Sequence, residues 1–381
     1  MSEWPMVKLK ELMRKTRSID PRKYPDEEFA LYSIPAYDNG IPEKIFGRDV
    51  GSSKILLKDS DVVLSKIVPH IRRTWVITDG EKQIGSSEWI VFNDDRFDPQ
   101  FIANYLKSDV FHYQLLTTVA GVGGSLNRAR PAAVAELKIP LPPLGEQKRI
   151  AEILGGVSKA INEIRTEIKR VESLCGAVVS LYAEDQSTKK LEDLATLSGG
   201  LSLGSHRKNK PHSVGYLRVA NVFWGKILYD EIKELNCTDQ EFERTLLQDG
   251  DVLITEAHAN RFQVGRSAVF RGEGQALVFQ NHLFRARPNK NIDSDVLAAM
   301  LSSVAVRRQL YQMAKTTSGL NTISISQVRS LRVPVLDTTK QAELLSFLQE
   351  SNKLNHLLHR KLSLLQELQK SLATRAFAGL L

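Results

Sequence analysis

Side chains that can hydrogen-bond to bases and phosphates gather in short polar loops of this sequence. The stretch GSHRKNK, residues 204–210, contains His206, Arg207, Lys208, Asn209 and Lys210 in consecutive positions. Arg and Lys match the acceptor atoms of guanine, Asn and Gln match adenine, and cationic side chains pair with phosphates. The stretch is therefore a candidate contact to nucleic acid. The alternative is a solvated basic loop, which is the commoner state of any single residue of this kind.

Further loops carry the same residue types in both halves of the chain. In the second half they are His258, Asn260, Arg261, Arg266, Gln280, Asn281, Thr317 and Asn321. In the first half they are Lys66, His70, Arg72, Arg73, Ser86, Ser125, Asn127, Arg128 and Arg130. We predict these residues as DNA contacts, and for each of them a solvated loop stays the open alternative. The tryptophans Trp75, Trp89 and Trp224 are instead predicted to lie in the core.

Motifs for catalysis are missing from the sequence. It has no GxxxxGK[ST] phosphate loop, no HExxH zinc pair and no Asn/Asp-Pro-Pro-aromatic box of an amino-methyltransferase. Glu231 and Lys233 form only the E-x-K half of a nuclease site, because residues 211–221 upstream contain no acidic side chain. Cys175 and Cys237 form no CxxC pair, which disfavours a zinc site or a disulfide framework. We therefore predict a non-catalytic chain that holds no metal or cofactor of its own.

Basic residues are in excess, and most of the excess lies in one stretch. The net charge is +8 over 381 residues. Residues 190–335 carry 19 basic and 14 acidic side chains, whereas residues 1–145 carry 20 and 19. A polyanion is the partner that such a basic stretch favours.

The sequence contains an internal repeat, two copies of one unit. LLKDSDVVLSK, residues 56–66, aligns with LLQDGDVLITE, residues 246–256. GSLNRARPAAVAELKIPLPPLGEQ, residues 124–147, aligns with SGLNTISISQVRSLRVPVLDTTKQ, residues 318–341. The offset is about 190 residues, which indicates duplication of a whole domain and not a solenoid of short repeats.

Both copies predict the same order of elements. A mixed region of short strands and turns comes first, and an amphipathic helix follows at residues 99–116 in the first copy and 293–313 in the second. A loop of Gly, Ser and Asn comes next, then a short apolar strand that ends in proline. A long helix closes each copy.

The stretch IPLPPLGEQKRIAEIL, residues 139–154, joins such a strand to the first long helix. Proline cannot donate to a sheet ladder and disfavours helix in the residue before it, so Pro142 and Pro143 end the strand. Apolar residues then alternate in steps of four and three, at Ile150, Leu154, Val157, Ile161, Ile164, Ile168 and Val171. This period of 3.5 residues predicts a coiled-coil seam, with a single amphipathic helix as the alternative.

The second long helix has a broader apolar stripe, which includes Leu358, Leu362, Leu365 and Leu372. Thr338, with Gln341 three residues later, predicts a capping box at the start of this helix. We expect the two long helices to pair with each other.

These patterns predict an α+β fold with two similar globular mixed α/β domains, separated by two long helices that form an antiparallel, pseudo-two-fold symmetric coiled coil. The predicted globular domains are residues 1–143 and 187–336, and the predicted helices are residues 144–186 and 337–381. We expect no membrane span, because the sequence has no apolar run of about 18 residues. The N-terminal residues lack the apolar core of a signal peptide, so a cytoplasmic location is expected.

The proline-rich motif, followed by a heptad helix in a chain built of two such units, resembles the specificity (S) subunits of type I restriction–modification enzymes. The last residues, LQKSLATRAFAGLL (368–381), resemble the end of the second conserved helix of that family. The second copy departs from the motif, because VPVLDTTKQAELL (333–345) keeps Pro334 and Gln341 but lacks the second proline pair. The resemblance covers the whole chain.

The resemblance implies that each globular domain is a target-recognition domain for one half of a bipartite, asymmetric site in double-stranded DNA. The coiled coil would set the spacer and dock two methyltransferase (M) subunits, which restriction (R) subunits then join. S-adenosylmethionine, ATP and magnesium are expected on those partner subunits, and no membrane is expected as a partner. Two alternatives stay open: a coiled-coil adaptor for RNA or an acidic protein, and a stand-alone DNA-modifying enzyme.

Overall fold

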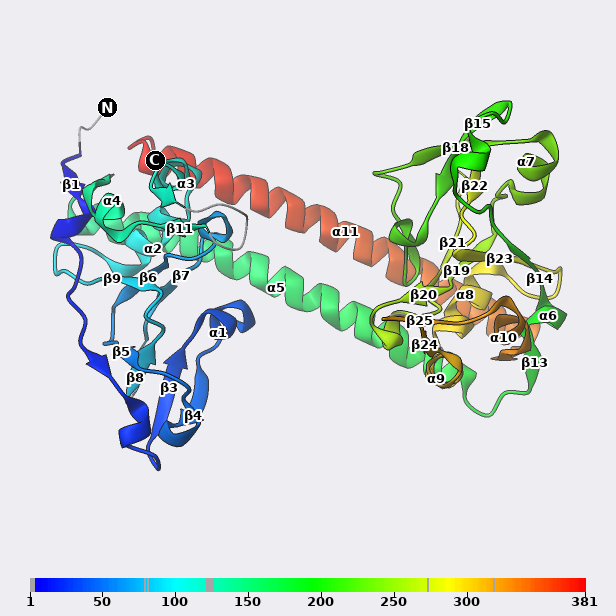
Figure 1. The fold of residues 1–381 in the computed structure, drawn as a ribbon, viewed down its shortest axis with the longest axis horizontal. Helices are drawn as coiled ribbons and strands as arrows, with labels where there is room; N and C mark the ends of the chain where they lie inside the picture. Colours follow the sequence, from blue (N-terminus) through cyan, green and yellow to red (C-terminus); the bar gives the residue numbers. More distant parts are fainter. Residues whose placement is uncertain (1–3, 79, 81, 121–126, 273, 318) are drawn as a thin grey trace. The chain divides into compact units, whose positions relative to one another are not determined.

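The chain divides into two compact units in the computed structural model (Figure 1). Unit 1 comprises residues 1–165 and 360–381, and unit 2 comprises residues 166–359. The structure describes residues 4–78, 80, 82–120, 127–272, 274–317 and 319–381. Each unit has its own sheets and takes a part of both long helices.

Unit 1 begins with short strands and 3-10 helices and ends in the first long helix. Its elements in chain order are β1 Met6–Lys8, η1 Leu9–Glu11, β2 Ser18–Ile19, η2 Pro21–Lys23, β3 Glu28–Tyr32, α1 Ile34–Asn39, β4 Glu43–Phe46, η3 Gly47–Asp49, β5 Lys54–Leu56, β6 Val62–Ser65, η4 Pro69–Ile71, β7 Thr74–Val76, β8 Gln83–Gly85, β9 Trp89–Phe92, α2 Pro99–Lys107, α3 Asp109–Leu116, β10 Val119–Ala120, β11 Arg128–Ala129, α4 Pro131–Glu136, β12 Lys138–Pro140 and α5 Leu144–Ala183.

Two main sheets form the body of unit 1. One has the order β2-β5-β8-β3-β4, in which β3 and β8 run parallel and the other neighbours antiparallel. The other has the order β7-β6-β9 and is antiparallel. All residues of β6 and β9 are buried, and α2 packs on this sheet (Figure 1). The ring of Phe377, from the end of the second long helix, packs edge-on against Tyr105 of α2 at 5.0 Å.

Unit 2 repeats this order of elements after the first long helix. They are β13 Thr188–Lys190, α6 Leu191–Leu194, β14 Ala195–Gly199, η6 Ser205–Arg207, β15 His212–Leu217, η7 Val219–Asn221, β16 Val222–Phe223, β17 Lys226–Ile227, β18 Lys233–Cys237, α7 Asp239–Thr245, β19 Val252–Thr255, β20 Ala257–His258, η8 Arg261–Gln263, β21 Ser267–Val269, β22 Leu277–Phe279, β23 Leu283–Pro288, α8 Ser294–Ser302, α9 Val304–Met313, β24 Lys315–Thr317, β25 Leu320–Thr322, α10 Ile325–Ser330, β26 Arg332–Pro334 and α11 Thr338–Phe377.

The sheets of unit 2 match those of unit 1. The order β14-β23-β19-β21 contains the counterparts of β9, β6 and β7, and the order β18-β15-β22 contains the counterparts of β4, β3 and β8. The pair β15 and β22 is parallel, as β3 and β8 are in unit 1. The two copies that the sequence predicts therefore have the same fold.

A buried aspartate at the start of the central strand holds the same turn in both units. Asp61 is fully buried, accepts from the backbone N–H of Lys58 at 2.8 Å and from Nε of Arg14 at 2.8 Å. In unit 2 Asp251 accepts from the N–H of Gln248 at 2.8 Å and pairs with Arg287 at 2.7 Å. The repeated LL-x-D-x-D sequence is thus explained by one structural device, a buried carboxylate satisfied by backbone amide and guanidinium donors.

The two amphipathic helices are each broken in the middle, so the prediction of single helices over 99–116 and 293–313 is wrong. Ser108 separates α2 from α3, and Ser303 separates α8 from α9. Both serines have extended backbone (ψ 156° and 152°), and each hydroxyl donates to the carbonyl three residues back, at 2.6 Å. Serine competes in this way with the helical hydrogen bonds.

Each copy closes by pairing its first strand with its last. β1 pairs antiparallel with β12, and β13 pairs antiparallel with β26. Both strands end in proline, Pro140 in β12 and Pro334 in β26, so the first strand ends two residues before Pro142, where the sequence predicted its end. The short helices α4 and α10, which precede these strands, were not predicted, because a helix of six residues is too short to show a recognisable pattern of apolar residues.

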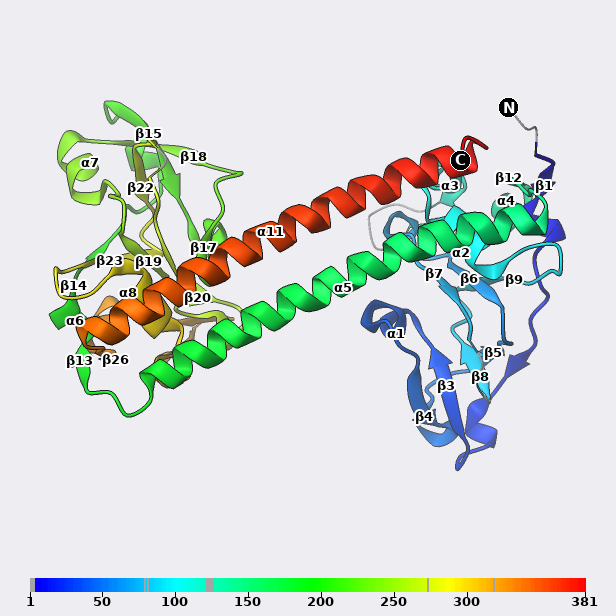
Figure 2. The ribbon, with the colours of Figure 1, turned by 180° about the vertical axis from the view of Figure 1, so that it is seen from behind.

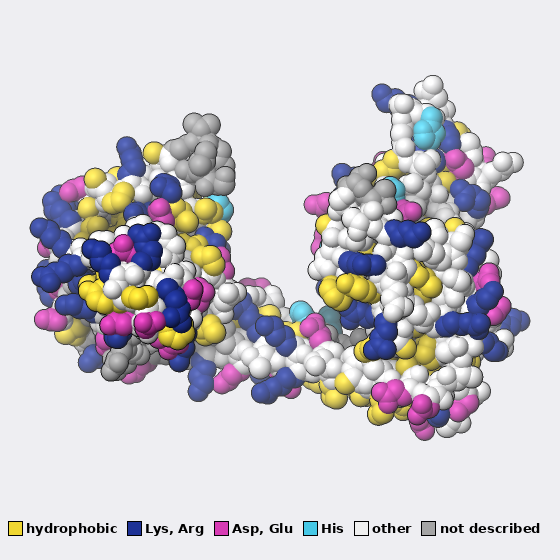
Figure 3. All heavy atoms as spheres, turned by 60° about the horizontal axis from the view of Figure 1, so that its bottom comes forward, with side chains coloured by type: hydrophobic (Ala, Val, Ile, Leu, Met, Phe, Trp, Pro, Cys, Tyr) yellow, Lys and Arg dark blue, Asp and Glu magenta, His cyan; other side chains and the backbone are white. Residues whose placement is uncertain are grey.

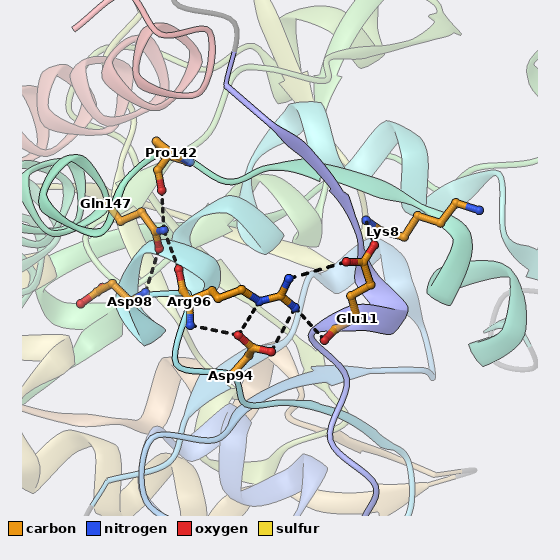
Figure 4. A network of polar contacts seen from close by, with 7 residues as sticks. All are labelled: Lys8, Glu11, Asp94, Arg96, Asp98, Pro142 and Gln147. Atoms are coloured by element: carbon orange, nitrogen blue, oxygen red, sulfur yellow. Dashed lines mark hydrogen bonds and ion pairs between the residues drawn. The ribbon is translucent and has the colours of Figure 1, made fainter.

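Gln147 in the first turn of α5 connects this helix to the start of α2 (Figure 4). Its side chain is fully buried. Its Oε1 accepts from the N–H of Asp98 at 2.8 Å, and its Nε2 donates to the carbonyls of Arg96 at 2.9 Å and Pro142 at 2.7 Å. The glutamine of the proline-rich motif therefore fixes the long helix to the globular part of unit 1. We call this arrangement the glutamine anchor.

Arg96 is itself held in place within the same network (Figure 4). Its Nε donates to Asp94 at 2.8 Å, and its terminal nitrogen donates to the carbonyl of Glu11 at 3.0 Å. The hydrogen bond from Arg96 lowers the pKa of Asp94. The carbonyl that accepts from the anchor thus belongs to a segment with fixed geometry.

Gln341 forms the corresponding glutamine anchor in unit 2. Its Nε2 donates to the carbonyls of Leu336 at 3.0 Å and Asn291 at 3.2 Å, and its Oε1 accepts from the N–H of Asp293 at 3.3 Å. Unlike Gln147, Gln341 is half-buried. The same amide therefore joins α11 to the residues before α8.

The capping residue of α11 is Asp337, so the predicted capping box of Thr338 and Gln341 is wrong. Oδ1 of Asp337 accepts from the N–H of Lys340 at 2.9 Å. Aspartate is a strong N-cap because its carboxylate satisfies a free amide and lies at the positive end of the helix dipole. The side chain of Gln341 is therefore not used in capping and forms the glutamine anchor instead.

The two long helices are 40 residues each and are uninterrupted (Figure 2). At 1.5 Å per residue each is about 60 Å long. In unit 1, Leu154 of α5 shares a hydrophobic cluster with Ala376 of α11, and in unit 2 Val179 shares one with Leu344. The start of one helix thus accompanies the end of the other, and the helices are antiparallel.

Burial along α5 follows the predicted apolar stripe. Ile150, Leu154, Ile161, Ile164, Ile168 and Val171 are buried, and Val157 is half-buried. The stripe of α11 is less covered: Leu358 is buried, whereas Leu362, Leu365 and Leu372 are half-buried. Ser158 of α5 accepts a hydrogen bond from Gln369 of α11 at 2.7 Å in unit 1.

Candidate nucleic-acid interface

Three loops of unit 1 meet at the end of β6. Nζ of Lys66 donates to the carbonyl of Ser87 at 2.6 Å, and the N–H of Ala129 donates to the carbonyl of Lys66 at 2.8 Å. Arg128, whose side chain is exposed, pairs with Glu88 at 3.2 Å. Residues predicted from separate stretches of the sequence are therefore brought together at one edge of the sheet.

The remaining polar residues of this edge come from the same loops. Oγ of Ser86 accepts from the N–H of Glu88 at 3.2 Å, and the carbonyl of Asn127 accepts from the N–H of Val68 at 3.1 Å. Arg130 is exposed, and its Nε donates to the carbonyl of Thr118 at 3.3 Å. Ser125, predicted as a contact, lies outside the described residues.

The turn from Val68 to Arg72 has a strained backbone. Val68 and Arg72 both have left-handed conformations, with φ of 48° and 56°. For a β-branched residue this conformation is a genuine outlier, of the kind that persists where the surrounding structure enforces it. His70, between the two, is exposed at the surface of this turn.

The two arginines that follow this turn differ in what they can reach. Arg72 is half-exposed and pairs with Asp109 of α3 at 2.6 Å, and this hydrogen bond is the main cause of the lowered pKa of Asp109. Arg73 is buried and makes two bonds of 2.8 Å to Asp38 of α1. Arg73 thus fastens the turn to the adjacent helix and does not present its charge at the surface.

The basic stretch of residues 206–210 in unit 2 also splits into buried and exposed members. Arg207 is buried, donates to the carbonyl of Asn236 at 3.1 Å and pairs with Glu241 at 3.2 Å. Lys210 pairs with the same carboxylate at 2.6 Å. The hydrogen bond from Lys210, with further help from the N–H of Thr238 and from Arg207, lowers the pKa of Glu241 to about 2.

The other members of this stretch lie at the surface. His206, Lys208 and Asn209 are exposed, on a turn that is fixed from below by the Glu241 pairs. A turn with a fixed backbone and exposed polar side chains can make contacts to bases or phosphates without losing much conformational entropy. Figure 3 shows that Lys and Arg side chains are spread over the visible face with Asp and Glu among them, so the charges of this face do not single out a site.

A small sheet, β20-β25-β24, carries the next group of predicted residues. Asn321 is buried, and its Nδ2 donates to the carbonyls of His258 at 3.3 Å and Ala259 at 2.9 Å. The N–H of Asn260 donates to Nδ1 of His258 at 2.9 Å. Asn321 therefore shapes the loop, whereas Asn260 is exposed. The side chain of Thr317 lies outside the described part of the chain.

Arg261, the first residue of the turn η8, and Arg266, which follows this turn, both make contacts within unit 2. Arg261 donates to the carbonyl of Ala314 at 2.8 Å and lies over the ring of Tyr311 at 4.4 Å. Arg266 is buried, donates to the carbonyl of Val219 at 3.2 Å and lies over the ring of Phe223 at 4.9 Å. Burial lowers the pKa of Arg266.

Gln280 and Asn281 precede β23 and are half-buried. Their backbone amides donate to the carbonyls of Leu217 and Leu201, both at 2.9 Å. The neighbouring His282 is exposed and pairs with Glu256 at 2.6 Å. This loop lies at the end of the central sheet of unit 2 and corresponds to the loop of Ser86 in unit 1.

Sequence reasoning missed the aromatic residues beside these loops. Phe262 and Tyr311 are stacked, with ring centroids 4.7 Å apart, and Arg307 lies over Trp224 at 4.9 Å. Trp89 is buried as predicted, but Trp75 and Trp224 are only half-buried. One signal in the sequence was that residues 296–336, which include Arg307 and Tyr311, contain no Asp or Glu, as suits a surface that faces a polyanion.

The described residues contain no cluster of His, Cys, Asp and Glu that could hold a metal ion. None of the described helices combines the length and the apolar character needed to cross a membrane.

Comparison with known proteins shows which proteins the chain resembles. Residues 1–173 match the family of the type I restriction modification DNA specificity domain. The chain is 27% identical to the type I restriction enzyme EcoKI specificity subunit of Escherichia coli (strain K12), over 73% of this chain and 65% of that protein. It is 21% identical to the StySPI specificity subunit of Salmonella potsdam, over 74% and 65%. Residues 1–173 thus match a type I specificity domain, and the chain is similar to type I specificity subunits.

The specificity-subunit fold extends over the whole chain. A solved structure titled "Structural basis underlying complex assembly and conformational transition of the type I R-M system" matches with a TM-score of 0.64 and 21% identity, covering 100% of this chain and 99% of that one. This likeness confirms the predicted fold class of two mixed α/β parts with two long helices. The aligned region spans 65% of the length of each of the two curated relatives. Specificity subunits are a non-catalytic family.

Proposed function

We propose that this specificity subunit selects the DNA target of a type I restriction–modification complex, with each unit reading one half of a bipartite, asymmetric duplex site. The observation that carries the proposal is the duplicated unit: both copies have the same sheets and the same glutamine anchor to a long helix. Their loops, in contrast, carry different side chains. Equal scaffolds with different loops are what two different half-sites require.

The exposed polar residues of each unit are the proposed contacts. In unit 1 these are His70, Arg128 and Arg130, with the half-buried Lys66 beside them, and in unit 2 they are His206, Lys208, Asn209 and Asn260. Acidic side chains are absent from the sequence of residues 110–135 and 296–336, which include the paired strands β10 and β11 in unit 1 and β24 and β25 in unit 2. The absence of carboxylates reduces repulsion of phosphates. The buried arginines are assigned to holding the loops.

The long helices are proposed to set the spacer between the half-sites and to bind two methyltransferase subunits. Both helices leave leucines exposed, among them Leu181 at 65% and Leu357 at 60%. Leu354, Leu364 and Leu368 are also more than two-fifths exposed. Apolar side chains in a row on a helix surface mark protein contacts. Pairing of the helices about a pseudo-two-fold axis is part of the same proposal.

The chemistry is proposed to reside on the partner subunits. Methyltransferase subunits would bring S-adenosylmethionine, and restriction subunits, which join the complex, would bring ATP and magnesium. The expectation of a cytoplasmic location, which rests on the sequence, stays a prediction.

The test is co-expression of this chain with the methyltransferase subunit encoded beside it, followed by sequencing of methylated bases in the host genome. We expect one split motif with a constant gap and two unlike half-sites. An intact complex that leaves no new methylated motif would reject the proposal. Binding to RNA or to an acidic protein, without preference for duplex DNA, would then favour the adaptor alternative.

A further inference from the structure

Unit 2 has a group of exposed and half-buried rings next to its polar loops. We call it the aromatic surface, and it consists of Phe223, Trp224, Phe262 and Tyr311. Phe262 is 60% exposed, Phe223 is 40% exposed and Tyr311 is 37% exposed. Aromatic side chains in a cluster at a protein surface mark a binding site more often than rings that are exposed singly.

Arginines lie over three of these rings. Arg261 lies over Tyr311 at 4.4 Å, Arg266 over Phe223 at 4.9 Å and Arg307 over Trp224 at 4.9 Å. Arg307 and Tyr311 are four residues apart in α9, so they lie on the same face of this helix. The pairs therefore form one continuous surface across β16, η8 and α9.

Phe262 is held at the tip of this surface in a fixed position. Its ring stacks on Tyr311 with centroids 4.7 Å apart and planes at 27°. Its N–H donates to Oδ1 of Asn260 at 3.0 Å, and Arg261 fastens the turn to the carbonyl of Ala314 at 2.8 Å. The exposed ring is thus supported on one side and open on the other. Because the ring is already ordered in the free protein, little conformational entropy is lost when a ligand binds to it.

The charges around this ring favour nucleic acid over protein. Residues 257–272 and 296–336 contain no Asp or Glu, while they contain Arg261, Arg266 and Lys315 among other cations. Glu256, which precedes the first stretch, is paired with His282 at 2.6 Å. A surface of rings and guanidinium groups without carboxylates suits a polyanion that has flat apolar faces, and nucleic acid is such a ligand.

We propose that Phe262 acts as an aromatic wedge, stacking on a base of the half-site bound by unit 2 and partly unstacking one base step. Apolar side chains inserted between base pairs have this effect in duplex DNA. The proposal rests on the proposed function, because it takes duplex DNA as the ligand. In unit 1 the turn η4 has the aliphatic Ile71, 45% exposed, and contains no Phe, Tyr or Trp. The wedge is therefore proposed for the half-site of unit 2.

The experiment uses the complex of this chain with its methyltransferase subunit and a duplex that carries the split motif found by methylation sequencing. 2-Aminopurine replaces one base of either half-site at a time, outside the methylated positions, and its fluorescence reports unstacking. We expect the wild-type complex to raise the fluorescence at one step. Phe262→Ala should abolish this rise and weaken binding about ten-fold, as expected from the loss of one base–aromatic stack.

Two further variants make the result specific. Phe262→Trp keeps a ring and should keep both the fluorescence rise and the affinity. Phe46→Ala is the control, because Phe46 is likewise an exposed phenylalanine, 40% exposed and covered by Arg48 at 4.8 Å, but it belongs to β4 of unit 1. This variant should change neither quantity.

Equal affinity and equal fluorescence in the wild type and Phe262→Ala would overturn the wedge while leaving the proposed function intact. Loss of the methyltransferase subunit from Phe262→Ala in size-exclusion chromatography, with unchanged fluorescence in the remaining complex, would also overturn it and assign the surface to a protein contact. A host without any split methylated motif would overturn the proposed function itself, and the wedge with it. The three failures are therefore distinguishable.

Discussion

The glutamine anchor of unit 1 should contribute more to stability than that of unit 2. Replacing Gln147 by Ala removes a fully buried amide and leaves the N–H of Asp98 and the carbonyls of Arg96 and Pro142 without this partner. An unsatisfied buried polar group costs about 1–3 kcal/mol, and two of these three groups are partly reached by water, so we expect about 3 kcal/mol. Gln341→Ala should cost about 1 kcal/mol, because Gln341 is half-buried and its bonds are longer.

Hydrogen–deuterium exchange followed by mass spectrometry measures this effect locally. Since the chain has two units, global unfolding need not be a single transition, whereas local opening can be followed in each unit. A cost of about 3 kcal/mol corresponds to roughly 100-fold faster exchange at the start of α5 and the start of α2 in Gln147→Ala. Gln349→Ala is the control, because this glutamine is exposed on α11. Equal exchange in Gln147→Ala and Gln349→Ala would refute the reasoning.

The other predictions concern charges of both units. Arg207→Ala should destabilise unit 2 by about 2 kcal/mol in thermal unfolding, because it removes the buried guanidinium that donates to Glu241 and to the carbonyl of Asn236, while Lys210 still pairs with the carboxylate. Lys208→Ala should leave stability unchanged and instead reduce the salt slope of DNA binding by about 1. The pKa of Glu241 is lowered to about 2 in the folded chain, so its contribution to folding stability is fully present above the unfolded pKa of 4.5 and is lost as the pH falls toward 2. Glu241→Gln should therefore lose less stability than the wild type as the pH falls through this range. An identical pH dependence of stability in the variant and the wild type would contradict the assignment. Asp61→Ala should lower the free energy of unfolding of unit 1 by about 3–5 kcal/mol, because it leaves the largely buried Arg14 without its carboxylate partner. Chemical denaturation measures this change.

The duplicated fold and the long helices could be read from the sequence because their signals extend over many residues. The heptad stripe from Ile150 to Val171 spans several turns, and the two proline-ended strands recur at the same offset. Local errors arose where one residue decides the structure. Ser108 and Ser303 break the predicted helices, and nothing in an amphipathic pattern distinguishes a serine that turns the chain from one that faces solvent.

The candidate contacts were predictable as loops but not as individual side chains. Composition alone could not separate Arg207, buried against Glu241, from Lys208 beside it, because the difference depends on a carboxylate from α7. The same holds for Arg73, whose partner Asp38 lies 35 residues earlier. Long-range ion pairs of this kind follow from the tertiary fold and have no local sequence signal.

The most direct test of the account is the methylated motif of a variant with one heptad removed from each long helix. A heptad shortens a helix by about 10.5 Å, equivalent to about three base pairs, and removal from both helices keeps their apolar stripes aligned. If each unit reads a half-site and the helices set the distance, methylation sequencing should return the same two half-sites with a gap shorter by about three base pairs. An unchanged gap, or altered half-sites, would contradict the account.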